Sequence, residues 1–184
     1  IVVHLAALIG IPYSYRAIDS YIQTNVTGTF NVIEASKKNN VEKIICTSTS
    51  EVYGSAQYIP IDESHPYVPQ SPYSASKIAA DQIALSYYYS FNLPITVLRP
   101  FNLFGPRQSL RAVIPSIILQ SINSEVINIG ATNTFRDFNF VEDTCEAYYK
   151  CIISKKKILK GNTINIGSGE KFSIKDIIKK VSKI

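Results

Sequence analysis

Residues 46–77, CTSTSEVYGSAQYIPIDESHPYVPQSPYSASK, combine the end of an apolar strand, a long loop and the start of a helix. The strand end delivers the hydroxyls of Ser48 and Thr49 and the carboxylate of Glu51. Tyr73 and Lys77 follow after the loop, and residues four apart in a helix share one face, about 6 Å apart along the axis. A lysine ammonium that close to a phenol favours the phenolate, so we expect Lys77 to lower the pKa of Tyr73 from its usual value of about 10. Such a pair is suited to taking a proton from an alcohol near neutral pH.

Strands and helices alternate on both sides of this stretch. The continuous apolar run at residues 1–5 is typical of a parallel strand buried on both faces, and residues 42–48 and 95–99 are expected to form the next two strands. Apolar residues at helical spacing predict helices from about Asp19 to 37 and from Ser74 to about Tyr89. This alternating order predicts an α/β fold built on a doubly wound parallel sheet.

The second half of the chain has a different pattern, which begins after residue 107. In chain order we expect a helix at 112–123, a strand at 126–129, a strand and a helix within 135–153, a strand at 163–166, and a helix that a capping box opens at Ser173. Before it, prolines at 60, 66 and 69 predict a loop over residues 62–70, and a loop of this length beside a reactive helix is expected to be functional.

Composition indicates an ordinary globular protein, with 46% hydrophobic and 18% charged residues among 184. No apolar run approaches the roughly 20 residues that span a bilayer, so we expect no membrane partner. Three cysteines without a C-x-x-C spacing predict reduced thiols in a cytoplasmic protein and no metal site. Ten of the nineteen Lys and Arg lie in residues 150–184 without interleaved aromatic residues, so we expect a solvated surface rather than a nucleic-acid site.

Three separate motifs carry a resemblance to a known family. VEKIICTSTSEVYG, SPYSASKIAADQIA and LPITVLRPFNLFGPR occur in the order strand, loop, helix, strand. The chain resembles the extended short-chain dehydrogenase/reductases, specifically their nucleotide-sugar epimerases and dehydratases, over essentially all its residues. A glycine-rich phosphate loop and methionine are both absent, so we expect an internal piece of a longer protein that lacks its N-terminal and C-terminal portions.

The resemblance implies a partial Rossmann-like fold in two interleaved parts. The dinucleotide-binding part would span residues 1–107 and about 136–153. The smaller substrate-binding part would span about 108–135 and 154–184. Family members bind NAD, with NADP not excluded here, and are commonly homodimers through two helices, one of which carries the Tyr/Lys pair.

The resemblance also implies roles for the site residues. Tyr73 would be the base on the sugar 4-hydroxyl, Lys77 would hold the nicotinamide ribose, and Thr49 would hydrogen-bond the reacting oxygen. The expected cofactor-binding residues are Leu5, Ala6, Ala7, Asn25, Thr47, Tyr73, Lys77, Pro100 and Phe101. The expected substrate-binding residues are Thr49, Asn102, Arg107, Arg136 and Asn165. For Asn25 we expect a supporting position behind the site, and for Asn165 a turn-stabilising role is an equal alternative.

Ser50 and Glu51 separate the subfamilies. Dehydratases of this family carry Asp-Glu or Ser-Glu after the hydroxyl pair, where Glu51 could remove the acidic proton on carbon 5 of a 4-keto sugar. Either Ser50, through water, or Glu51 would then protonate the departing 6-hydroxyl. The run from SPYSASK onward looks most like UDP-N-acetylglucosamine 4,6-dehydratases of legionaminic-acid-type pathways. UDP-glucuronate decarboxylase and 4-epimerase remain alternatives, as does a dinucleotide-binding sensor or scaffold.

Overall fold

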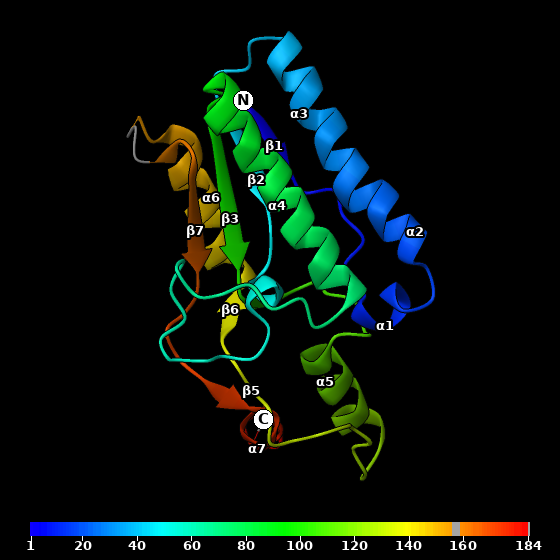
Figure 1. Ribbon diagram of the computed structural model, residues 1–184. Coiled ribbons are helices and arrows are strands. Elements are labelled where there is room, and N and C mark those ends of the chain that lie inside the picture. Colours follow the sequence, from blue (N-terminus) through cyan, green and yellow to red (C-terminus); the bar gives the residue numbers. More distant parts are fainter. Residues whose placement is uncertain (156–158, 184) are drawn as a thin grey trace. The chain divides into compact units, whose positions relative to one another are not determined.

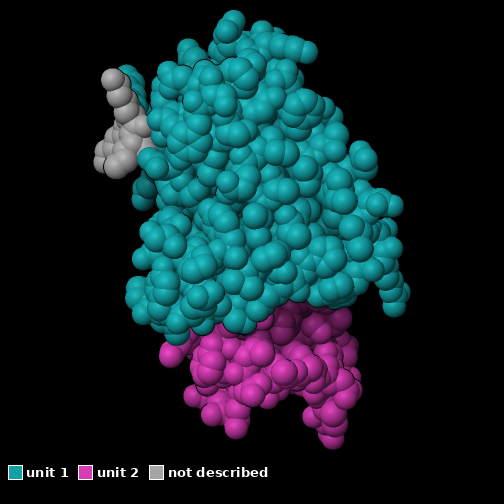
Figure 2. All heavy atoms as spheres, in the orientation of Figure 1, with its two compact units in different colours: residues 1–100, 147–166 teal, residues 101–146, 167–184 magenta. Residues whose placement is uncertain are grey.

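The computed structural model describes residues 1–155 and 159–183. The chain folds into two compact units (Figure 2). Unit 1 contains residues 1–100 and 147–166, and unit 2 contains residues 101–146 and 167–184.

Unit 1 is built on a four-stranded parallel sheet (Figure 1). Its strands are β1 (Val2–His4), β2 (Ile44–Thr47), β3 (Ile95–Pro100) and β7 (Asn162–Ile166), in the spatial order β1-β2-β3-β7. The register aligns Val3 with Ile45, Ile45 with Thr96, and Val97 with Thr163. All four strands occur where the apolar runs predicted them, and the parallel order confirms the α/β fold.

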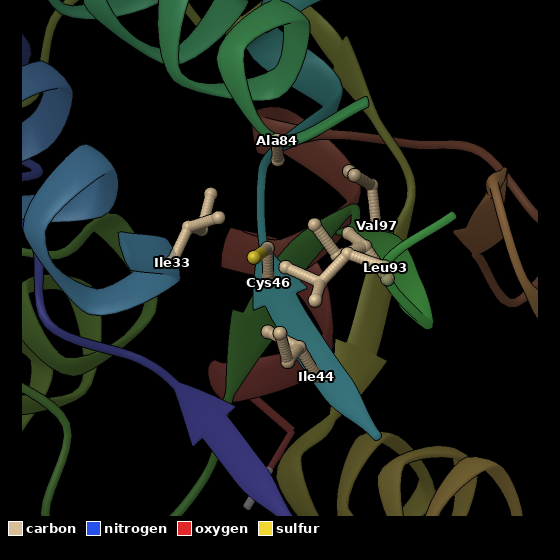
Figure 3. Packing of buried hydrophobic residues seen from close by; sticks show 7 residues of the cluster. Ile33, Ile44, Cys46, Ala84, Leu93 and Val97 are labelled. Carbon is tan, nitrogen blue, oxygen red and sulfur yellow. The ribbon is translucent and has the colours of Figure 1, made fainter. Parts of the chain in front are cut away.

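Helices cover both faces of this sheet (Figure 1). On one face lie α3 (Gly28–Lys38) and α4 (Pro72–Phe91), whose Ile33 and Ala84 pack with Cys46 and Val97 in a buried cluster (Figure 3). Successive strand residues point to opposite faces. The next residue, Thr47, accordingly bonds Tyr148 of helix α6 (Val141–Ile153) on the other face, with 2.6 Å between the two hydroxyl oxygens.

The ends of helix α4 follow from its flanking residues. Ser71 caps the first turn through a reciprocal pair of hydrogen bonds with Ser74, and Pro72 occupies the first helical position, where no N–H is needed. The helix ends at Asn92, whose φ of 53° is the left-handed conformation that asparagine tolerates. The predicted helix is confirmed and runs two residues further at each end.

The helical segment that precedes α3 is less regular than its spacing predicts. It consists of α2 (Ile18–Tyr21) and a π-helical stretch η1 (Ile22–Thr27), which carries the buried Asn25. A short helix, α1 (Ile11–Ser14), lies ahead of it and was not predicted. Short π-helical stretches are frequent at functional sites.

The described residues of unit 2 form two small sheets, two whole helices and the first part of helix α6. Strand β4 (Asn102–Phe104) pairs in parallel with β6 (Phe138–Phe140), and β5 (Phe135–Arg136) pairs antiparallel with β8 (Phe172–Ser173). Helices α5 (Val113–Asn123) and α7 (Ile174–Val181) complete it. The capping box predicted at the start of α7 is confirmed, since Ser173 and Asp176 bond each other's backbone N–H groups. The core of the unit consists of Ile117, Phe138, Ile174 and Ile177.

One strand prediction in unit 2 is wrong, and a second is confirmed only in part. Residues 126–129 form no strand, because the side chain of Gln120 bonds both backbone groups of Asn128, at 2.8 and 3.2 Å, in place of a neighbouring strand. The expected single strand through FRDFNF divides into β5 and β6 at Asp137, whose carboxylate accepts hydrogen bonds from Ser168 and Gly169 instead of staying on a pleated face.

All three cysteines, Cys46, Cys145 and Cys151, are free thiols, as their spacing predicted. Across residues 1–155 and 159–183, no helix has the length and apolar character needed to cross a membrane.

Candidate active site

The carboxyl end of strand β2 and the start of helix α4 bring the predicted catalytic residues together. Thr49 follows β2 and caps a 3-10 turn, η2 (Ser50–Tyr53), by accepting a hydrogen bond from the Glu51 N–H at 3.2 Å. Tyr73 and Lys77 lie in the first two turns of α4. Ligands of parallel α/β sheets bind at this edge.

Tyr73 is buried beside Thr49 and Glu51, with 6% of its surface exposed. The pKa of Tyr73 is raised to about 12, mainly by burial and also by the nearby Glu51 charge, while a hydrogen bond with the Thr49 side chain opposes this rise. The structure therefore brings the phenol, the hydroxyl and the carboxylate together, as the sequence predicted.

The expectation that Lys77 lowers the pKa of Tyr73 is wrong for this structure. The Lys77 ammonium instead donates a hydrogen bond to the carbonyl oxygen of Thr47 at 2.7 Å. Lys77 is 5% exposed, and burial lowers its own pKa while the charge of Asp81 raises it. Desolvation of the phenol raises the pKa of Tyr73, an effect that residue spacing does not reveal.

The Lys77 ammonium keeps donors for a ligand. A lysine ammonium has three N–H donors, and within the described part of the chain Thr47 supplies its one acceptor. Thr47 itself is held on its side-chain oxygen by Tyr148. These features fit a ligand that carries adjacent hydroxyl groups, such as the ribose of a dinucleotide.

Sequence reasoning missed a buried ion pair next to this site. Arg99, fully buried on β3, bonds Asp81 of α4, with 2.9 Å between Nη2 and Oδ2. Ser48 donates to the same carboxylate oxygen at 2.7 Å, and the phenols of Tyr53 and Tyr67 accept from the guanidinium at 2.9 and 2.7 Å. The spacing of Asp81, four residues after Lys77 on the same face of the helix, is the signal that could have found it.

The predicted cofactor-binding residues of unit 1 include residues at the ends of strands β1 and β3 and the buried Asn25. Leu5 and Ala6 are exposed and Ala7 is half-buried directly after β1, whereas Pro100 is buried at the end of β3. Asn25 is fully buried, and its amide bonds both backbone groups of Leu8 and donates to Ser76 Oγ at 2.9 Å. Asn25 thus connects the segment after β1 to helix α4, the supporting position that was expected.

Asn165 also bonds protein groups through its side chain. Its Oδ1 accepts from the Tyr53 hydroxyl at 2.8 Å, and its Nδ2 donates to the carbonyl of Ile61 at 3.3 Å. Its backbone N–H donates to the Glu63 carboxylate at 2.7 Å. These contacts fit the turn-stabilising alternative, because they hold the loop that precedes α4.

The remaining predicted residues belong to unit 2. Asn102 and Arg136 line one cavity of about 280 Å³, and exposed Arg107 lines a different one of about 300 Å³. Phe101 is half-buried at the start of the unit. Within unit 2 the structure therefore groups Asn102 with Arg136 but not with Arg107.

Comparisons with known proteins agree with this architecture. A family model described as GDP-mannose 4,6 dehydratase matches residues 1–184. The dTDP-D-glucose 4,6-dehydratase of Dictyostelium discoideum is 33% identical over 196 residues, which cover 100% of this chain and 44% of that protein. The chain spans about half the length of the curated relatives it matches.

Two solved structures illustrate the range of relatives. The UDP-glucuronic acid 4-epimerase from Bacillus cereus, in complex with UDP-glucuronic acid and NAD, has a TM-score of 0.92 and 32% identity, covering 98% of this chain and 58% of that one. The dTDP-glucose 4,6-dehydratase from Bacillus anthracis, in complex with NAD, has a TM-score of 0.86 and 31% identity, covering 99% of this chain and 56% of that one.

Proposed function

This chain belongs to the GDP-mannose 4,6-dehydratase family of NAD-dependent nucleotide-sugar dehydratases and epimerases, and we propose that its complete gene product is a nucleotide-sugar 4,6-dehydratase. The substrate would be UDP-N-acetylglucosamine or a similar nucleotide hexose. The observation that carries this proposal is the meeting of Tyr73, Thr49 and Glu51 at one edge of the sheet.

Several residues of unit 1 would hold a nicotinamide dinucleotide. Lys77 has ammonium donors for the ribose hydroxyls, and exposed Leu5 and Ala6 lie directly after β1. Related structures contain NAD, and one relative contains NADPH, which supports NAD with NADP as the alternative. When bound, the oxidised dinucleotide supplies the hydride acceptor and a positively charged ring.

The chain's own groups would move the protons. In its phenolate form Tyr73 would take the proton of the sugar 4-hydroxyl. Burial raises the pKa of Tyr73 to about 12 in the chain alone, and the Thr49 hydrogen bond and the positive ring of a bound dinucleotide would both lower it. Glu51 then takes the proton on carbon 5, which a neighbouring 4-keto group has made acidic. Ser50, through water, or Glu51 itself protonates the hydroxyl that departs from carbon 6.

Two other reactions start from the same oxidation. The likeness to a UDP-glucuronic acid 4-epimerase favours a 4-epimerase as the second candidate, and decarboxylation of UDP-glucuronate is a third. Both need Tyr73 but not a base for carbon 5. A dinucleotide-binding sensor would need neither role, so the intact Thr49, Tyr73 and Lys77 argue against it.

Mass spectrometry of products decides among these candidates. The complete gene product is incubated with a panel of UDP-, dTDP- and GDP-sugars. We expect a 4-keto product lighter than its substrate by one water. A product of unchanged mass and altered stereochemistry would support the epimerase, and loss of carbon dioxide from UDP-glucuronate the decarboxylase. Dinucleotide binding without any product would support the sensor.

We further propose that the complete gene product is a cytoplasmic homodimer that uses helices α3 and α4. Its support is the exposure of three aromatic side chains on these helices, Phe30 at 41%, Tyr89 at 74% and Phe91 at 54%. Light scattering on the complete gene product should give twice the mass of one chain, and a monomer at micromolar concentration would contradict the proposal.

A further inference from the structure

We propose that the buried Asp81–Arg99 ion pair is a positioning device that fixes the Thr49–Glu51 turn by anchoring the residues on both sides of it, Ser48 and Tyr53. The inference rests on the proposed function only where it assigns chemistry to Glu51. Asp81 and Arg99 would touch no substrate; they would act through the turn.

The first anchor lies just before the turn. Ser48 is 4% exposed and donates its hydroxyl to Asp81 Oδ2 at 2.7 Å. Its backbone N–H donates to the Leu98 carbonyl, also at 2.7 Å, which ties it to the strand that carries Arg99. Both bonds are short, and the bond to a carboxylate is of the stronger, charge-assisted kind.

The second anchor lies at the end of the turn. The fully buried Tyr53 accepts from Arg99 Nη1 at 2.9 Å and donates to Asn165 Oδ1 at 2.8 Å. The guanidinium carbon lies 5.1 Å from the centre of the Tyr53 ring, within the range of a cation–π contact. Tyr53 is therefore fixed on both its face and its hydroxyl.

Between the anchors, the hydrogen bonds that link Thr49 and Glu51 to the rest of the turn are long. Thr49 Oγ1 accepts from the Glu51 N–H at 3.2 Å, and the Thr49 and Glu51 carbonyls accept from Val52 and Gly54 at 3.5 and 3.3 Å. These distances lie at or beyond the long end of the range for N–H···O bonds. Glu51 is therefore held weakly by the turn itself and depends on the two anchors, together with the bond from the Val68 N–H to the Val52 carbonyl at 3.0 Å.

The ion pair also connects the turn to the helix that carries the proposed base. Asp81 lies on α4 two turns after Tyr73, and it bonds both Arg99 and Ser48 through Oδ2. Helix α4 and the Glu51 turn are thus joined through one carboxylate oxygen. This connection would keep the two proton-transfer groups, Tyr73 and Glu51, at a constant separation.

The chain offers a matched pair of variants. Tyr53 and Tyr67 each accept a hydrogen bond from Arg99 and lie under its guanidinium, which is 5.1 Å from one ring centre and 4.8 Å from the other. Only Tyr53 belongs to the turn that contains Glu51. Tyr53→Phe and Tyr67→Phe therefore each remove one hydroxyl from the same cation, at different places in the chain.

Two measurements on the complete gene product test the proposal. Hydrogen exchange should show faster exchange of the amides of residues 51–54 in Tyr53→Phe than in Tyr67→Phe. The kcat of Tyr53→Phe for water loss should fall about 10- to 100-fold at unchanged KM, because displacement of a reacting group by about 1 Å costs that much. Tyr67→Phe should keep its kcat within a few-fold.

Equal exchange rates at residues 51–54 in the two variants would overturn the proposal, and so would equal kcat values at equal folded fractions. Exchange needs no turnover, so it decides the inference even if the wild-type protein converts no nucleotide sugar. A wild-type protein that converts no nucleotide sugar would contradict the proposed function but not this inference.

Discussion

Between Pro72 and Asp81, helix α4 buries hydroxyl and ionisable side chains, whereas from Gln82 to Phe91 it packs mainly apolar ones. The first half buries Tyr73, Lys77 and Asp81 together with two serines. The second half places Ala84 in the apolar cluster of the sheet, with Ile83, Leu85 and Tyr87 against it.

The two halves of the helix contribute differently to the stability of the fold: apolar packing stabilises the second half, whereas burial of ionisable groups is unfavourable in the first half. Burial raises the pKa of Tyr73 and of Asp81 and lowers that of Lys77, so each ionised form is disfavoured in the first half. Such shifted groups cluster at functional sites. The apolar second half packs the helix against the sheet, and the first half carries the desolvated polar groups of the candidate site.

Tyr73→Phe should change the protein most. Removal of the phenol oxygen removes the proposed base, so turnover of the complete gene product should fall about 10²- to 10⁴-fold with little change in stability. Tyr21→Phe is the control, because the Tyr21 ring packs edge-on against Tyr73 at 6.2 Å and its hydroxyl donates to the Gly10 carbonyl, away from Tyr73. Steady-state rates for both variants check the prediction, and a Tyr73→Phe variant as active as the control would remove Tyr73 from the mechanism.

Asp81→Asn should have the second largest effect, which is a loss of folding stability. The change leaves the fully buried Arg99 guanidinium without its counter-ion, which should lower the free energy of unfolding by about 3 to 5 kcal/mol. Urea unfolding monitored by circular dichroism measures the loss. A loss below about 1 kcal/mol would show that the polar half of α4 tolerates an unpaired charge and would remove the contrast between the halves.

Alkaline pH should reveal the burial of Tyr73. Because the folded state raises the pKa of Tyr73 from 10 to about 12, folded protein holds this proton more tightly than the unfolded chain. The resulting stability is complete below pH 10 and is lost as the pH rises to 12, a difference of about 2 to 3 kcal/mol. Unfolding free energies of wild type and Tyr73→Phe at pH 9 and 12 isolate this contribution, and parallel pH profiles would contradict it.

Ala84→Gly should have the smallest effect. Loss of a methyl group from the apolar cluster and of helix propensity should cost about 1 to 2 kcal/mol of unfolding free energy. Turnover should stay within a factor of two, because Ala84 lies two turns beyond Lys77 on the apolar half. A thermal melt together with a rate measurement tests this, and a selective loss of turnover would show that the two halves are coupled.

Secondary structure could be predicted from the sequence where neighbouring residues alone determine it. The four strands of the parallel sheet, helix α4 and the Ser173–Asp176 capping box were predicted and are confirmed, although strands β1 and β7 are only partly buried. The strand expected at 126–129 is wrong because the Gln120 side chain satisfies the Asn128 backbone. The sequence of residues 126–129 does not reveal that a side chain eight residues earlier bonds their backbone.

The site was only partly predictable for the same reason. The positions of Thr49, Glu51 and Tyr73 follow from strand and helix order, and they meet as expected. The pKa of Tyr73 does not follow from its spacing to Lys77, because it depends on how completely the folded chain removes water from the phenol. Likewise, Tyr53 and Arg99 are 46 residues apart, and only the fold brings them together.

The most direct test of the 4,6-dehydratase assignment is a single turnover of the Glu51→Gln variant with UDP-N-acetylglucosamine in the complete gene product. We expect the absorbance of reduced dinucleotide to appear and persist, because oxidation at carbon 4 needs Tyr73 but not Glu51. The sugar nucleotide should not lose water. Formation of the dehydrated product at the wild-type rate would contradict the role of Glu51 and, with it, the proposed reaction.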